Sequence, residues 1–219
     1  LAIIWCVRGD GQLIALTYQR EQEVVAWHRH IIGGVFGTGN AVCESVAVIP
    51  TEDSEYELYM IVKRTIGGAT TRYVEYLNTF DFDQTNNTSF NYLDSQLGLS
   101  KSQTTLTAGI SATVTTIPVA SVSGLSSSGK IKIGGEIISY TGISSLNLTG
   151  CTRGQNITSA KAHLSGAVVK EVINIIGGLN HLNGQTVSIL ADGATHPDKV
   201  VSNNSITLDR FSTDVKIGL

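Results

Sequence analysis

Apolar and polar residues alternate along most of this chain, in short runs that end at glycine, asparagine, aspartate or proline. Apolar residues rarely recur at the three- or four-residue spacing of an amphipathic helix. Period-two alternation is typical of half-buried strands, and many short strands separated by turns are typical of sandwiches, barrels and propellers. The pattern therefore predicts an all-β protein built from antiparallel strands.

The first 79 residues contain two successive groups of predicted strands. A Gly-Asp-Gly turn at 9–11 joins the first two strands, because such residues favour a tight hairpin. A glycine-rich stretch at 33–39 ends the first group, and Gly-Gly at 67–68 provides a hairpin turn in the second. The strands are predicted at 3–8, 12–18, 23–32, 41–49, 58–66 and 70–77. Such groups resemble propeller blades, and since two blades cannot close a ring, we expect further blades before Leu1.

Residues 103–170 differ in composition from the rest of the chain. Thr and Ser alternate there with aliphatic residues, and the segment carries five basic residues and a single acid, Glu136. Its net charge of +4 leaves −7 for the remainder of the chain, whose total is −3. So sharp a change in charge and composition indicates a separate folding unit, a small inserted β-module.

The remaining parts, 80–102 and 171–219, are predicted to form one discontinuous β domain. Asn-Gly and Asp-Gly turns separate its C-terminal strands. These strands are predicted at 172–176, 186–190, 199–201, 205–208 and 214–217. A strand-like stretch at 90–93 is expected to pair with 172–176, which makes the module an insertion into a loop, where insertions are tolerated.

The composition of the chain limits the kinds of partner that it is expected to bind. Charged residues make up only 15% of the sequence, and the net charge of −3 gives no electrostatic reason for binding nucleic acid or a membrane surface. No apolar run approaches the ~20 residues of a membrane span, and no signal peptide is visible. The chain starts inside a predicted strand without methionine, so we expect it to be a fragment of a longer protein.

Five cysteine and tryptophan residues are predicted to lie in the core. Cys6, Cys43 and Cys151 lack metal-ligand spacing, and we interpret them as reduced core residues of a protein assembled in the cytoplasm. Trp5 and Trp27 each lie in a predicted strand of alternating apolar character, where a large ring anchors a core or a contact between blades.

No motif in the sequence predicts catalysis or a bound cofactor. His28 and His30 are two residues apart on one face of a strand, but no third ligand stands at a zinc-binding spacing. We interpret them as a polar strand face or a subunit contact. Asp10 and Asp192 precede glycines and are interpreted as turn residues. We therefore expect a protein that is not an enzyme and has no catalytic residues, cofactor or metal site.

The inserted module carries the residues that we interpret as a candidate contact surface. Lys130, Lys132 and Arg153 are basic, and Tyr140 adds an aromatic ring with a hydroxyl group. Such side chains are suited to anionic sugars or to an acidic neighbouring protein. A purely architectural role for the module is an equal alternative.

Sequence blocks near both ends of the chain are characteristic. REQEVVAWHRH at 20–30 is followed by ESVAVIP at 44–50, and GLNHLNGQTVSILADG at 178–193 is followed by SITLDRFSTDVKIGL at 205–219. The first pair resembles blade sequences, and the second the region after the propeller, of tail nozzle proteins (tail tubular protein B) from short-tailed bacteriophages. In the module, GEIISYTG, GCTRG and the later Ala162-His163 resemble a small β-module that recurs in phage tail and fibre proteins.

The resemblance implies a structural virion protein, located in the tail and assembled in the cytoplasm of the bacterial host. Six subunits would form a funnel below the portal and adaptor that closes the tail and conducts DNA during ejection. The implied partners are further copies of the chain, the adaptor and portal side, and tail fibres, with DNA passing through without specific binding. An acidic scaffold suits that passage, because each phosphate contact would slow it. The alternative is carbohydrate or receptor binding through residues 103–170.

Overall fold

The computed structural model describes residues 2–50, 52, 56–78 and 91–219, and these form an all-β protein. About 60% of the residues lie in strands, the sheets are antiparallel, and none of those described closes into a barrel or ring. The predicted all-β class is therefore confirmed. No helix in the described ranges has the length and hydropathy needed to cross a membrane.

The first sheet is a three-stranded antiparallel meander. Its strands are β1 (Ala2–Val7), β2 (Leu13–Gln19) and β3 (Val24–His30). The predicted hairpin turn joins β1 to β2, and Gly11 in this turn has a φ of +85°. A Cβ on Gly11 would lie 2.3 Å from Cγ1 of Val42, so glycine is needed both for the turn and for its contact with the next sheet.

The second sheet repeats this meander with longer strands. Its strands are β6 (Val42–Pro50), β7 (Tyr56–Ile66) and β8 (Ala69–Leu77), preceded by the short strands β4 (Val35–Phe36) and β5 (Gly39–Asn40). The inner faces of the two sheets share one core, to which Trp5 and Val7 add partly buried contacts. This core consists of Leu13, Ile32, Ala41, Cys43, Leu58, Met60 and Val62.

The C-terminal sheet has the strand order β19-β18-β21-β9. Its strands are β9 (Leu97–Ser100), β18 (Thr186–Ala191), β19 (Ala194–Val200) and β21 (Asp214–Gly218). The predicted pairing of 90–93 with 172–176 is wrong: residues 91–93 lie outside any strand, and residue 90 falls outside the described ranges. Instead β9 pairs with β21, because Leu97 and Leu99 lie opposite Ile217 and Val215 and extend their apolar face.

The inserted module contains a five-strand path and a small three-stranded sheet around its own core. The path is β10 (Gln103–Thr105), β17 (Val168–Ile176), β12 (Gly129–Ile133), β13 (Glu136–Tyr140) and β16 (Thr152–Gln155). The small sheet is β11 (Ile117–Pro118), β15 (Asn147–Thr149) and β14 (Gly142–Ser144). This core is separate from the one beneath the C-terminal sheet.

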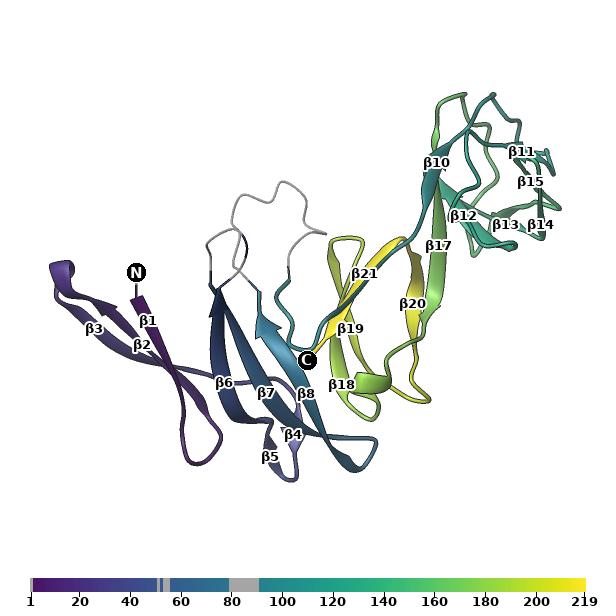
Figure 1. Cartoon of the computed structure of the whole chain (residues 1–219). Coiled ribbons are helices and arrows are strands. Elements are labelled where there is room, and N and C mark those ends of the chain that lie inside the picture. Colours follow the sequence, from purple (N-terminus) through teal and green to yellow (C-terminus); the bar gives the residue numbers. More distant parts are fainter. Residues whose placement is uncertain (1, 51, 53–55, 79–90) are drawn as a thin grey trace.

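One continuous strand connects the module to the C-terminal sheet region. The first half of β17 pairs with β10 and β12, and its second half pairs with β20 (Ile206–Ser212). The nine residues of β17 span about 30 Å, so the module and the C-terminal region are joined by a hydrogen-bonded strand. Figure 1 shows β17 leaving the module and running down beside β20.

The structure corrects the predicted location of Trp27. Trp5 is partly buried against the shared core, as expected, but Trp27 is 61% exposed. Trp27 lies opposite Leu16 in the β2–β3 register, whereas Ala15 and Leu13 are the inward-facing residues of β2. The three cysteines are free; Cys43 and Cys151 are buried, and Cys6 is only partly buried.

A strained residue in the module gives a stability prediction. Ile157 has a φ of +63° and a fully exposed side chain, and a left-handed conformation costs a β-branched residue roughly 1–2 kcal/mol. We expect Ile157→Asn to stabilise the protein by about 1 kcal/mol, because asparagine tolerates this conformation. Hydrogen exchange of peptides from the module measures the change. Leu164→Asn is the control, since Leu164 is also exposed but has no positive φ; equal shifts in both variants would contradict the prediction.

Candidate anion-binding cleft at the module junction

A cleft of about 740 Å³ lies where the module meets the C-terminal sheet. Strands β9, β10, β12, β17 and β21 all contribute to it, so it exists only when both parts of the chain are folded. Its lining residues are Ser100, Lys101, Gln103, Lys132, Gly134, Val168, Lys170, Asp192, Thr213 and Asp214. Most of these are polar or charged.

The module side of the cleft is cationic. Lys132 on β12 and Lys170 on β17 are direct cross-strand partners, so the two side chains lie on the same face of the sheet. Like charges placed directly opposite each other destabilise a sheet. Neither ammonium group has an ion pair or hydrogen bond with any residue that the structure describes.

A third lysine stands at the junction but is partly engaged. Nζ of Lys101 lies 3.4 Å from Oε2 of Glu171, whose side chain is buried. The other oxygen of Glu171 accepts a hydrogen bond of 3.2 Å from the backbone N–H of Ser126. Lys101 therefore supplies the countercharge for a buried carboxylate and adds to the positive potential at the edge of the cleft.

The opposite side of the cleft carries two carboxylates. One oxygen of Asp192 accepts hydrogen bonds from the backbone N–H and hydroxyl of Thr213, at 2.8 and 2.7 Å, and from the N–H of Asp214 at 2.9 Å. Burial would raise the pKa of Asp192, but these hydrogen bonds and the nearby Lys132 outweigh burial and lower it. Asp214 accepts a hydrogen bond from the hydroxyl of Ser100. Asp192 is thus held ionised in a fixed orientation. The predicted turn at this aspartate is present, since Asp192 has a positive φ.

The four predicted contact residues have different environments. Lys132 faces the cleft, whereas Lys130 lies 4.3 Å above the ring of Phe211 and donates to Oδ1 of Asn156 at 2.7 Å. Lys130 therefore contributes to the contact between the module and β20. Tyr140 is only 2% exposed, and its hydroxyl donates to the carbonyl of Ser126 at 2.8 Å. Burial, with Glu171 nearby, raises the pKa of Tyr140 to about 12.

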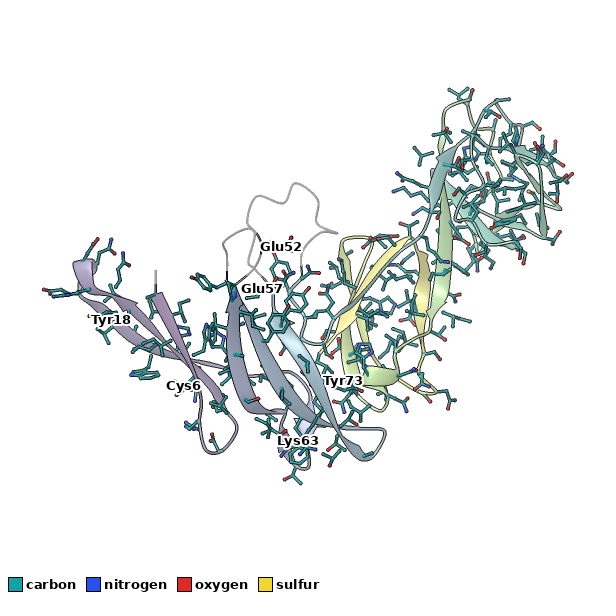
Figure 2. The ribbon with its side chains drawn as sticks, viewed as in Figure 1. Cys6, Tyr18, Glu52, Glu57, Lys63 and Tyr73 are labelled. Carbon is teal, nitrogen blue, oxygen red and sulfur yellow. The ribbon has the colours of Figure 1, made fainter. Side chains whose placement is uncertain are left out.

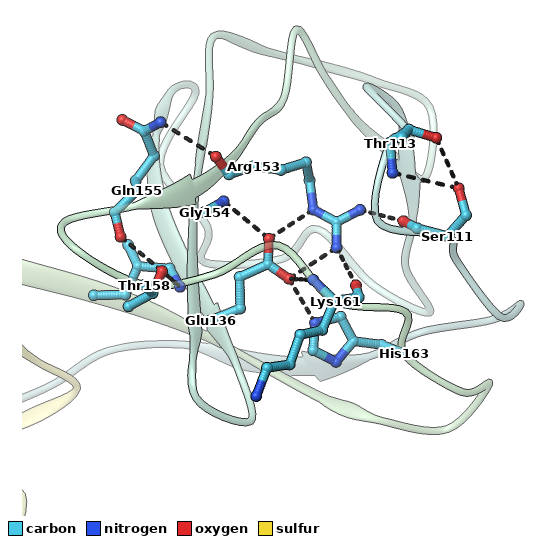
Figure 3. Close-up of polar contacts among 10 residues, drawn as sticks. Ser111, Thr113, Glu136, Arg153, Gly154, Gln155, Thr158, Lys161 and His163 are labelled. Carbon is cyan, nitrogen blue, oxygen red and sulfur yellow. Dashed lines mark hydrogen bonds and ion pairs between the residues drawn. The ribbon is translucent and has the colours of Figure 1, made fainter.

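The prediction that Tyr140 and Arg153 form part of a contact surface is wrong, because the module encloses both side chains. Arg153 binds the buried carboxylate of Glu136 through Nε at 2.9 Å and Nη2 at 2.8 Å. Its guanidinium also donates to the backbone carbonyls of Ser111 and Lys161. Figure 3 shows this guanidinium surrounded by acceptors from strand β13 and from two loops.

Glu136 is the centre of this internal network. Besides Arg153, its oxygens accept hydrogen bonds from the backbone N–H groups of Gly154 at 3.0 Å and Lys161 at 3.1 Å, and contact Nε2 of His163 at 2.8 Å. Glu136, Arg153 and His163 come from the GEIISYTG, GCTRG and Ala-His blocks, and the last two both contact the carboxylate of Glu136 (Figure 3). A buried carboxylate with this many donors holds loops together; it is not placed to react with a substrate.

Acid should weaken the module. Burial raises the pKa of Glu136, but its hydrogen bonds outweigh burial and lower the pKa from 4.5 to about 2. The stability that this group contributes is therefore fully present above pH 4.5 and is lost as the pH falls towards 2. Hydrogen exchange of peptides covering β12 and β13 should show this loss. The same pH dependence in a Glu136→Gln variant would contradict the assignment.

The two predicted strand histidines contact each other. Nδ1 of His28 lies 2.8 Å from Nε2 of His30, and the ring of His30 lies 4.9 Å from that of Trp5. Burial, together with His28, lowers the pKa of His30. In the described part of the chain, no group of three histidine, cysteine or acidic residues is arranged to hold a metal ion.

Several cleft residues were missed at the level of sequence. Lys101, Asp192 and Asp214 belong to parts of the chain that composition separates from the module, and Lys170 entered only the charge count. The one available signal was the excess of lysine in a segment that is inserted between strands of an acidic domain. No protein-family model matches the chain, and no curated protein matches it either.

Proposed function

We propose that this protein is a structural component of a phage tail, of the nozzle type, and that it acts by packing against neighbouring copies and other tail proteins. It is not an enzyme in this proposal. The supporting observation is a pair of apolar sheet faces that lie on the outer sides of the two N-terminal sheets.

The outer face of the first sheet carries a row of large apolar side chains. Ile4, Leu16 and Trp27 are neighbours across β1, β2 and β3, and both Ile4 and Trp27 are more than half exposed. Tyr18 and Val25 form the next row and are also exposed. Tyr18, labelled in Figure 2, marks the end of this face far from the second sheet.

The outer face of the second sheet has the same character. Ile61 on β7 lies opposite Val74 on β8, which is 72% exposed, and Tyr59 lies opposite Tyr76. The rings of the two tyrosines are 5.9 Å apart. Lys63, labelled in Figure 2, ends this face with an ion pair to Glu44 at 3.1 Å.

Two sheets that share an inner core and present apolar outer faces are suited to serve as consecutive blades. In a propeller, each blade is covered on both faces by its neighbours. Contiguous apolar surface that is left exposed on a soluble protein marks an interaction site. Both outer faces therefore favour assembly with further sheets, from this protein or from its neighbours in the tail.

Charge supports the same proposal. The chain outside the module carries −7, and a conduit lined by acidic and neutral groups would not retain DNA, because the phosphate backbone binds through lysine and arginine. The basic module stands away from the two N-terminal sheets (Figure 1). In the proposed tail, DNA passes along the acidic scaffold, and the partners lie on the portal and adaptor side and among the tail fibres.

Oxidative footprinting tests this assignment within one molecule. Trp27 should react readily with hydroxyl radicals in the isolated chain and should be protected in purified particles of the phage that encodes it. Trp5 is the internal control, since it packs against the shared core and should react slowly in both. Particles that lack the protein, or in which Trp27 stays as reactive as in the isolated chain, would contradict the proposal.

A further inference from the structure

We propose that the cleft between the module and the C-terminal sheet binds an acidic saccharide. Its carboxylate would lie between Lys132 and Lys170, and its hydroxyl groups would donate to Asp192 and Asp214. This site goes beyond the structural role proposed above and does not depend on it.

Lys132 and Lys170 provide the anion site. Most lysines elsewhere are engaged by a partner: Lys63 pairs with Glu44, and Lys199 pairs with Asp209 at 2.6 Å. Lys132 and Lys170 instead face each other across adjacent strands, with no such partner in the described ranges. A bound carboxylate removes their mutual repulsion and can accept hydrogen bonds from both ammonium groups.

Asp192 and Asp214 determine which groups the ligand must carry beside its anionic group. Only one oxygen of Asp192 is occupied by its turn, and only one oxygen of Asp214 by Ser100, among the contacts of the described residues. The remaining carboxylate oxygens are acceptors, to which a sugar hydroxyl can donate. The same negative charges repel a bare, doubly charged anion such as phosphate. A singly charged carboxylate that carries neighbouring hydroxyls satisfies both sides of the cleft.

The cleft is preformed and of suitable size. Its volume of about 740 Å³ falls within the range of about 300–1,000 Å³ that is usual for small-molecule sites. Besides the continuous strand β17, two backbone hydrogen bonds hold the junction. The N–H of Lys101 donates to the carbonyl of Thr213 at 2.7 Å, and the N–H of Glu171 donates to the carbonyl of Ser102 at 2.9 Å. A ligand therefore needs little ordering of the protein when it binds.

Isothermal titration calorimetry on the whole chain at low salt tests the proposal. The probes are galacturonate, the neutral sugar galactose and inorganic phosphate. We expect galacturonate to bind, galactose to give no heat, and phosphate to bind at least about tenfold more weakly than galacturonate. Equal binding of phosphate, or no binding of galacturonate, would overturn the proposal.

Matched variants locate the site. Lys132→Gln with Lys170→Gln should weaken galacturonate binding by at least about tenfold. Lys161→Gln with Lys216→Gln, which makes the same change in net charge outside the cleft, should leave binding unchanged. Asp192→Asn should also weaken binding and leave the fold intact, because asparagine tolerates the φ of +53° at this position. Equal weakening by both lysine pairs would mean that net charge alone attracts the ligand and would overturn the assigned site.

Discussion

Replacing Glu136 by glutamine is expected to destabilise the module by about 3–5 kcal/mol, the usual cost of removing one partner of a buried ion pair. The side chain of Glu136 is fully buried and that of Arg153 is 7% exposed. The glutamine amide keeps the shape of the carboxylate but leaves the guanidinium of Arg153 without a countercharge. It also removes one acceptor oxygen from the backbone N–H groups of the enclosing loops.

Hydrogen exchange is the appropriate measurement, because three separate cores make a single two-state unfolding transition unsuitable. Protection should fall in peptides covering β12 and β13 and remain unchanged in β6 and β7. Glu44→Gln is the matched control: Glu44 pairs with the exposed Arg72, so its loss should cost less than about 1 kcal/mol. An equal effect of both substitutions would show that the buried network does not stabilise the module.

Glu75→Gln is expected to destabilise the pair of N-terminal sheets by about 3 kcal/mol. Its partner Arg64 has a completely buried side chain, which bonds both oxygens of Glu75 and donates through Nε to the carbonyl of Gly33 at 2.8 Å. Gly33 lies in the loop that leads from the first sheet to the second. The ion pair therefore ties that loop to β7 and β8.

Tryptophan fluorescence during urea unfolding reports on this region, since both tryptophans lie in the first sheet. Arg64→Met in the Glu75→Gln background should recover part of the lost stability, because it removes the unpaired buried charge. Glu57→Gln is the control, since among the described residues Glu57 accepts a hydrogen bond only from the hydroxyl of Tyr59, two positions along the same strand. A double variant less stable than Glu75→Gln alone would contradict this explanation.

Local signals in the sequence were sufficient to predict the positions of most strands and hairpins. The Gly-Asp-Gly turn, the Gly-Gly turn and the alternation around them depend on conformations that few other residues adopt, so the strands on either side could be placed within a few residues. The length of β17 could not be predicted, because its first residues become a strand only by pairing with β10 and β12. The partner of β21 was missed for the same reason.

Burial was harder to predict than secondary structure. The first half of the strand that contains Trp27, residues 24–27, is apolar on both faces, so alternation alone does not indicate which face is covered. The ring of Trp27 proved to be exposed. In the module, Tyr140 and Arg153 have surface-like chemistry but are enclosed. The single acid among five basic residues was the available sign of an internal ion pair, and it points to the contact between Glu136 and Arg153.

The candidate cleft could be predicted only in part. The basic charge of the module was sufficient to identify Lys132 as a candidate contact residue. Its position opposite Lys170 depends on strand register, and the facing aspartates come from turns near the end of the chain. Register and domain junctions are set by long-range pairing, which composition does not encode.

Electron microscopy of the protein expressed from its complete gene tests the proposed tail function most directly. The proposal predicts closed rings with an axial channel, in which the outer faces that carry Trp27 and Val74 are covered by neighbouring sheets. Replacing Val74, which is exposed in the isolated chain, by lysine should prevent these rings without unfolding the chain. Monomers at every concentration, with no association with portal or adaptor proteins, would contradict it.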